Sequence, residues 1–82
     1  SHHLIIWMVY TALVDKLGYT PSARNVWDEL ERNFRYYDPT SKVIEDISVD
    51  ALEWFDTKGK KKSFPRSALD TLLSRMRKNP PE

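Results

Sequence analysis

The chain has 82 residues, of which 40% are hydrophobic and 30% charged, a composition that supports one small folded domain and excludes wholesale disorder. It contains no cysteine, which excludes disulfides and thiolate metal sites and is typical of proteins of the reducing cytoplasm, where we expect this protein to be located. The net charge of +1 divides unevenly, because residues 1–56 carry five basic and ten acidic side chains whereas residues 57–82 carry eight basic and two acidic ones.

The opening Ser-His-His of residues 1–3 is typical of a purification-tag remnant. We therefore expect a single domain over residues 4–78, followed by a tail or linker over residues 79–82. Without the two opening histidines the chain has no imidazole base, no cysteine nucleophile and no histidine metal ligand. We expect a protein that is not an enzyme, with no cofactor, no metal and no small-molecule substrate.

Residues 4–17 are apolar at nearly every position, which predicts a helix that is covered on most sides, with Gly18 as its C-cap. We expect it to be either the central core helix or the seam of a homodimer. The run is shorter than the roughly 20 residues of a membrane span, so we expect no membrane partner. Thr20 and Pro21 predict the start of a second helix over residues 21–36, with Thr20 as the N-cap and Pro21 as the first helical residue.

The remaining residues predict a small antiparallel sheet and a last helix. Strand-forming residues are concentrated in 43–47 and 52–55. Residues 56–59, Asp-Thr-Lys-Gly, suit a hairpin loop with a left-handed glycine, and residues 60–64 form the returning strand. Apolar residues at helical spacing predict a helix over 66–78. The fold class is therefore α+β, in the order helix, helix, hairpin of two or three strands, basic helix.

The hairpin and the last helix contain most of the basic side chains. Alternate residues of a strand face opposite sides, so Lys60 and Lys62 are expected on one face and Lys61 on the other. Lys58, Lys60 and Lys62 would project together as a compact cationic prong, which suits the phosphates of a nucleic acid. The residues that we expect to bind nucleic acid are Lys58, Lys60, Lys61, Lys62, Arg66, Arg75, Arg77 and Lys78. A structural interpretation stays open, because edge-strand lysines discourage aggregation and cations stabilise helix C-termini.

Two successive helices, a lysine-rich hairpin and a basic helix resemble a small helix-turn-helix or winged-helix domain. Residues 17–23 correspond to the turn between the helices and residues 54–64 to the wing. The resemblance implies a DNA-binding regulator of transcription, of the kind common in phages and mobile elements. The sequence departs from that family in the helix before the hairpin, where Asp28, Glu29 and Glu31 repel phosphates. We therefore expect double-stranded DNA to contact the hairpin and the last helix.

Two other functions stay open. The first is a protein-interaction or homodimerisation module, because the first helix offers more apolar surface than a small core needs. The interface residues of that alternative are Ile5, Trp7, Met8 and Tyr10. The second is an accessory domain of a longer enzyme, joined through Pro80 and Pro81.

Overall fold

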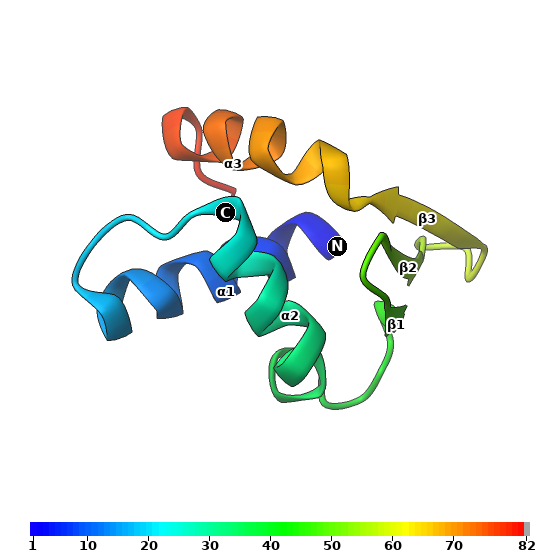
Figure 1. The fold of residues 1–82 in the computed structure, drawn as a ribbon. Helices are drawn as coiled ribbons and strands as arrows, with labels where there is room; N and C mark the ends of the chain where they lie inside the picture. Colours follow the sequence, from blue (N-terminus) through cyan, green and yellow to red (C-terminus); the bar gives the residue numbers. More distant parts are fainter. Residues whose placement is uncertain (82) are drawn as a thin grey trace.

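A computed structural model describes residues 1–81 and contains three α-helices and one antiparallel sheet of three strands (Figure 1). The elements are α1 (His2–Leu17), α2 (Ala23–Tyr37), β1 (Ile44–Ile47), β2 (Ala51–Phe55), β3 (Lys61–Pro65), the 3-10 turn η1 (Arg66–Ala68) and α3 (Leu69–Lys78). The α+β class and the predicted order of helices and strands are confirmed. None of the described helices is both long and apolar enough to cross a membrane.

The first helix begins at His2, two residues before the expected start. The His2 imidazole stacks on the Trp54 indole of β2, with ring centroids 3.9 Å apart. Burial, followed by the nearby charge of His3, lowers the pKa of His2 to about 4. The helix ends as expected, because Gly18 takes a left-handed φ of 77° and donates its N–H to the carbonyl of Val14 at 2.9 Å. The origin of residues 1–3 as a tag stays a prediction.

Of the two roles expected for α1, the structure shows that of a core helix. It packs against α2 and buries five apolar side chains, which are Ile5, Ile6, Val9, Tyr10 and Leu13. An apolar strip remains on its outer side, where Leu4 is 37% exposed and Met8 is 43% exposed. Most of the apolar run is therefore used by the interior of this one chain.

The second helix begins later than expected, because its N-cap is Ser22 and not Thr20. The Ser22 hydroxyl accepts the N–H of Asn25 at 3.1 Å, and the Asn25 side-chain oxygen accepts the N–H of Ser22 at 3.1 Å. This reciprocal capping box satisfies two N–H groups that the helix leaves unpaired. The residue three positions after Thr20 is Ala23, whose side chain has no acceptor for the Thr20 N–H, so Thr20 cannot form such a box. Pro21 therefore lies before the helix.

The sheet has the order β1-β2-β3, and its inner face joins the core through fully buried Ile44 and Leu52. The start of β1 is held by Asp38, a buried carboxylate at the end of α2. Its Oδ2 accepts the N–H of Val43 at 3.1 Å and the N–H of Ile44 at 2.8 Å. These bonds satisfy two backbone donors at the start of β1, which is an edge strand within the described part of the chain.

One junction connects the sheet to the helices. Trp27 of α2 is fully buried, and its Nε1 donates to the carbonyl of Ser48 in the turn between β1 and β2 at 3.0 Å. Arg66 donates its backbone N–H to the Asp50 carbonyl at 2.8 Å and its Nη1 to the Val49 carbonyl at 3.2 Å. The turn is thereby bonded to α2 on one side and to the start of η1 on the other.

We expect Trp27→Phe to lower the free energy of unfolding by about 2–4 kcal/mol, because it removes the bond to Ser48 and leaves a cavity in the core. Urea unfolding followed by circular dichroism measures the change. Trp7→Phe is the matched control, since Trp7 is only half-buried and the smaller loss should stay at about 1 kcal/mol or less. Equal losses in the two variants would contradict the assigned role of Trp27.

Candidate nucleic-acid interface

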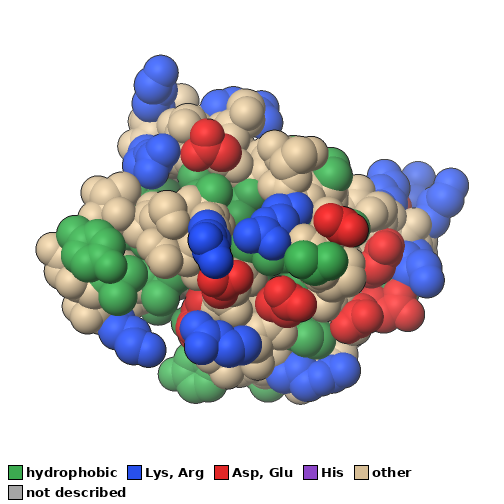
Figure 2. All heavy atoms as spheres, in the orientation of Figure 1, with side chains coloured by type: hydrophobic (Ala, Val, Ile, Leu, Met, Phe, Trp, Pro, Cys, Tyr) green, Lys and Arg blue, Asp and Glu red, His purple; other side chains and the backbone are tan. Residues whose placement is uncertain are grey.

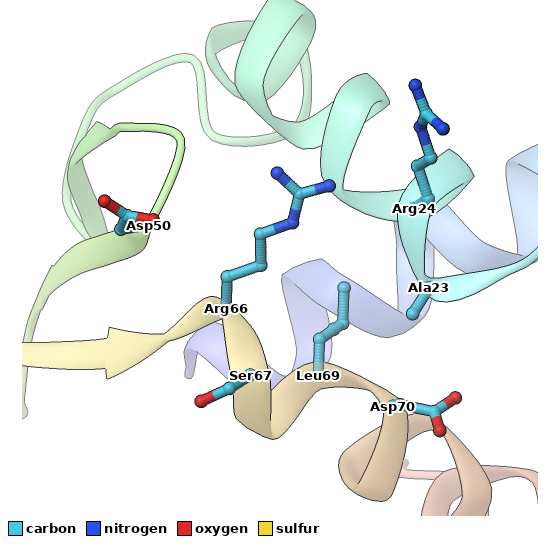
Figure 3. Close-up of a pocket in the computed structure, with 7 residues that line it drawn as sticks. All are labelled: Ala23, Arg24, Asp50, Arg66, Ser67, Leu69 and Asp70. Carbon is cyan, nitrogen blue, oxygen red and sulfur yellow. The ribbon is translucent and has the colours of Figure 1, made fainter.

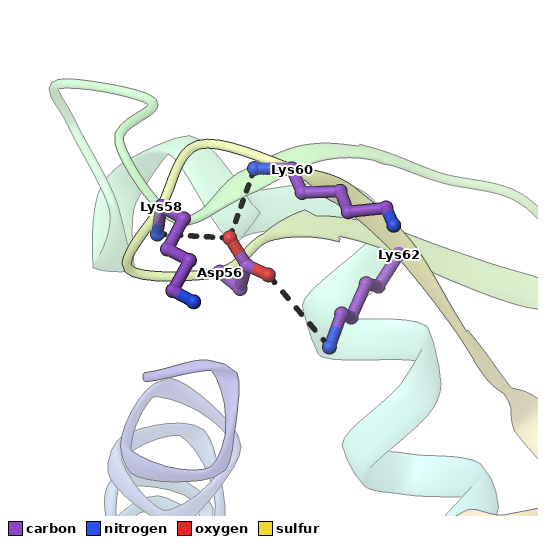
Figure 4. A network of polar contacts seen from close by, with 4 residues as sticks. All are labelled: Asp56, Lys58, Lys60 and Lys62. Carbon is purple, nitrogen blue, oxygen red and sulfur yellow. Dashed lines mark hydrogen bonds and ion pairs between the residues drawn. The ribbon is translucent and has the colours of Figure 1, made fainter.

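The loop between β2 and β3 is shaped by the carboxylate of Asp56 (Figure 4). Its Oδ1 accepts the backbone N–H groups of Lys58 and Lys60, both at 2.9 Å. Gly59 takes a left-handed φ of 80°, as expected, and donates its N–H to the Asp56 carbonyl at 3.0 Å. An aspartate at the start of a turn commonly binds the backbone two residues on. The loop is therefore held in one shape by its own side chain.

These contacts also favour the charged form of Asp56. The hydrogen bond from the Lys60 N–H lowers the pKa of the Asp56 carboxyl most, and the Lys58 N–H and the Lys62 ammonium lower it further. Desolvation acts in the opposite direction and is outweighed. The hairpin therefore holds a carboxylate at its centre across the physiological pH range.

Two of the four hairpin lysines are paired with carboxylates. Lys61 Nζ lies 3.4 Å from a carboxylate oxygen of Glu45 on β1, and Lys62 Nζ lies 3.7 Å from an oxygen of Asp56. The two lysines face opposite sides of the sheet, as expected, because Lys62 pairs with Trp54 and its neighbour points the other way. Both lysines and Glu45 are exposed to solvent and Asp56 is half-buried, so each pair contributes little to stability and each lysine can exchange its carboxylate for another anion.

Lys58 and Lys60 provide the free charge of the hairpin. Within residues 1–81 neither has a carboxylate within ion-pair distance, and both side chains are exposed. Figure 2 shows Lys and Arg side chains projecting on the right of the view, with Asp and Glu side chains directly beside them. The hairpin is therefore an end of mixed charge with two free lysines. The partners Glu45 and Asp56 were missed in the sequence, although an aspartate opening the turn was a local signal for the second.

Arg66 is bound to the fold at the junction. Its guanidinium donates to Val49 and lies 5.9 Å from the ring of Trp27. Together with Arg24 it lines a hollow of about 610 Å³ between the start of α2 and η1, where the Arg66 side chain extends toward α2 (Figure 3). Two aspartates line the same hollow, so its charge is mixed. Nothing in the sequence connects Arg24 with Arg66, because the two residues meet only through the packing of α2 on η1.

The last turn of α3 carries the other predicted contacts, which are Arg75, Arg77 and Lys78. All three are exposed, and none has a carboxylate within ion-pair distance in the described part of the chain. The Arg77 guanidinium donates to the Ser74 hydroxyl at 3.3 Å and lies 5.9 Å from the ring of Tyr10. Arg75 and Lys78 are the cations of this turn that are free of such contacts among residues 1–81.

The two groups of cations lie at opposite ends of the molecule. β3, η1 and α3 follow one another along one side, with the hairpin loop at one end and the end of α3 at the other (Figure 1). At about 3.3 Å per strand residue and about 1.5 Å per helix residue, the line from the start of β3 to the end of α3 is roughly 35 Å long. The longest dimension of the fold, 35 Å, agrees with this separation. The predicted contacts therefore form two groups, with Arg66 between them.

The residues of the alternative interface on α1 are mostly inside the fold. Ile5 and Tyr10 are buried, and Trp7 is half-buried with its ring stacked on that of Tyr10 at 5.0 Å. Met8 is exposed beside Leu4, one helical turn earlier. The surface left for a partner on this helix is therefore the strip of Leu4 and Met8.

Comparison with known proteins finds no protein-family model, no curated protein and no solved structure that matches the chain.

We expect the amide proton resonances of Lys58 and Lys60 to shift together on acidification, with a midpoint below the ordinary aspartate pKa of 3.8. Because the folded pKa of Asp56 is lowered, the stability that it contributes is present above 3.8 and is lost as the pH falls through the folded value. NMR spectra recorded over this pH range give the midpoint. Asp56→Asn is the control, since it should abolish the transition. A midpoint at or above 3.8 would contradict the assigned bonds.

Proposed function

We propose that the protein binds nucleic acid without catalysis, with double-stranded DNA as its ligand, through contacts to the phosphate backbone. The observation that carries the proposal is the continuous line of β3, η1 and α3, which has exposed and unpaired cations at both ends. Lys58 and Lys60 stand at the hairpin end, and Arg75 and Lys78 at the end of α3. Cations that neutralise phosphates release counterions, which provides affinity independent of sequence.

Between its two ends the line offers neutral donors. Four exposed hydroxyl side chains follow it at intervals of three or four residues, namely Ser63, Ser67, Thr71 and Ser74. Hydroxyl and backbone N–H groups donate to phosphate and sugar oxygens in most protein–DNA interfaces. They fix the position of the protein on the backbone while the lysines and arginines supply the attraction.

The separation of the two ends favours a duplex over a single strand. Roughly 35 Å is comparable with the repeat of B-DNA, about 34 Å per turn. A rigid duplex therefore presents phosphates to both ends at once, whereas a single strand first has to be held extended, at a cost in conformational entropy.

The charge on α2 supports the same choice of surface. Asp28, Glu31 and Arg32 lie together around a shallow hollow on the exposed side of this helix, where carboxylates outnumber cations. These carboxylates would repel a phosphate backbone, so we assign the DNA contacts to the hairpin and α3. The proposal retains the likeness to a winged helix, with residues 54–64 as the wing, and regulation of transcription as the biological role.

We expect the double variant Lys58→Ala/Lys60→Ala to weaken binding to a short random duplex and to lower the slope of log K against log salt by about two units, one for each lost phosphate contact. Fluorescence anisotropy at several salt concentrations gives the slope. Lys61→Ala should have a smaller effect, because the Lys61 ammonium is already paired with Glu45.

Arg32→Ala is the matched control, because it removes one exposed cation from the acidic side of α2. Its slope should equal that of the wild type. Binding that is absent at low salt, or a slope that the double variant leaves unchanged, would reject phosphate contacts by the hairpin.

A further inference from the structure

β3 is an edge strand whose hydrogen-bonding pattern follows from the backbone bonds at its two ends. It pairs with β2 and with no other strand among the described residues. One backbone hydrogen bond lies at each end of this pairing. The Asp56 N–H donates to the Lys60 carbonyl at 3.0 Å, and the Arg66 N–H donates to the Asp50 carbonyl at 2.8 Å. In an antiparallel pair, hydrogen-bonded and non-hydrogen-bonded residue pairs alternate. Every second residue from Lys60 to Arg66 therefore directs its backbone groups toward β2.

The residues that alternate with these direct their backbone groups outward, away from β2. Lys62 and Phe64 bond to β2, whereas Lys61 and Ser63 each turn an N–H and a carbonyl to the open edge of the sheet. Pro65 also directs its carbonyl to the open edge, and as a proline it has no N–H that could be left unpaired. The open edge thus offers two donors and three acceptors in the spacing of a strand.

The hairpin lysines leave this backbone edge accessible. Lysines on an edge strand often discourage pairing with another strand. Here the ammonium group of Lys61 pairs with Glu45 on β1, and that of Lys62 pairs with Asp56 at the loop, so neither is directed along the open edge. Lys61, Lys62 and Ser63 are all exposed, so no other described element covers the edge.

We propose that the open edge of β3 binds an extended, acidic segment of a partner protein, which adds to the sheet as a fourth, antiparallel strand. Backbone bonds to Lys61 and Ser63 provide the pairing, as in other cases of strand addition. The charge selects the partner, because four lysines surround this edge between residues 58 and 62. A second copy of the chain is disfavoured, since its own lysines would face these across the new pair. This ligand goes beyond nucleic acid, because it uses the backbone edge and not the ammonium groups alone.

The register also predicts the side chains of the partner. A residue opposite Phe64 lies on the inner face beside a half-buried ring, where an apolar side chain is favoured. Residues opposite Lys62 and Lys61 lie beside lysine side chains on either face, where a carboxylate of the partner can replace Asp56 or Glu45 at the ammonium group. Read along an antiparallel partner, the preferred order is one apolar residue, one of any type and two acidic residues.

The test uses a peptide of about eight residues, the length of an ordinary strand, with blocked ends and this order at its centre. Amide hydrogen exchange by NMR is the readout in the wild-type protein. On saturation, exchange at Lys61 and Ser63 should slow by about tenfold or more, while Lys62 and Phe64, already bonded to β2, should change little. A peptide with glutamines in place of its glutamates is the control and should bind more weakly.

A pair of variants separates the backbone edge from the charge. Ser63→Pro removes one outward N–H without touching the bonds to β2, and should weaken peptide binding roughly fivefold to tenfold. Ser63→Ala retains that N–H and should bind as the wild type does. If Ser63→Pro does not fold, the exchange pattern of the wild type alone decides.

Three results would overturn the proposal. The first is peptide binding with shifts on α1 or in the hollow beside Arg66 and no protection at Lys61 and Ser63. The second is protection of these two amides without peptide in a dimeric protein, which would make the occupant a second copy. The third is equal protection by a short DNA duplex, which would assign the edge to nucleic acid.

Discussion

Three successive carbonyls in the turn between β1 and β2 hold this fold together. Those of Ser48, Val49 and Asp50 each accept a hydrogen bond from another element, one from Trp27 and two from Arg66. The bond to Asp50 extends the pairing of β2 with β3 by one residue pair, whereas the carbonyls of Ser48 and Val49 lie outside the ladder, so side-chain donors from Trp27 and Arg66 remove the cost of leaving them unpaired. Because Trp27 is fully buried in α2 and Arg66 opens η1, the turn fixes where β3 ends and in which direction α3 leaves.

That direction determines how the basic residues can act. With β3 and α3 in one line, the cations of the hairpin and those of the last turn of α3 are kept apart and form two groups. The carboxylates of Glu45 and Asp56 reduce the free charge at the hairpin to Lys58 and Lys60. Nucleic acid would bind the ammonium groups of the hairpin, and an acidic strand would bind its backbone edge. Because both sets of groups belong to the same small hairpin, the two ligands would exclude each other.

Much of the fold followed from local patterns. The left-handed glycines at 18 and 59 and the positions of the strands were predicted, because a turn or an alternation depends on neighbours within a few residues. The predicted cap of α2, Thr20, was wrong, because Ser22 caps the helix and its partner Asn25 completes a capping box. At the site, the sequence predicted that Lys61 and Lys62 lie on opposite faces of the sheet, but it did not predict the carboxylates that pair with them.

From residue types and spacing alone came the class of the fold, the separation of acidic and basic parts and the absence of a cysteine or an internal histidine for chemistry. These depend on composition and on periods of two or 3.6 residues, which the chain carries locally. The packed structure was needed to learn that Arg66 binds a turn, that Lys61 meets Glu45 and that Ser63 faces an open edge. Each of these depends on strand register and on residues distant in the chain, where a shift of one position would exchange every partner.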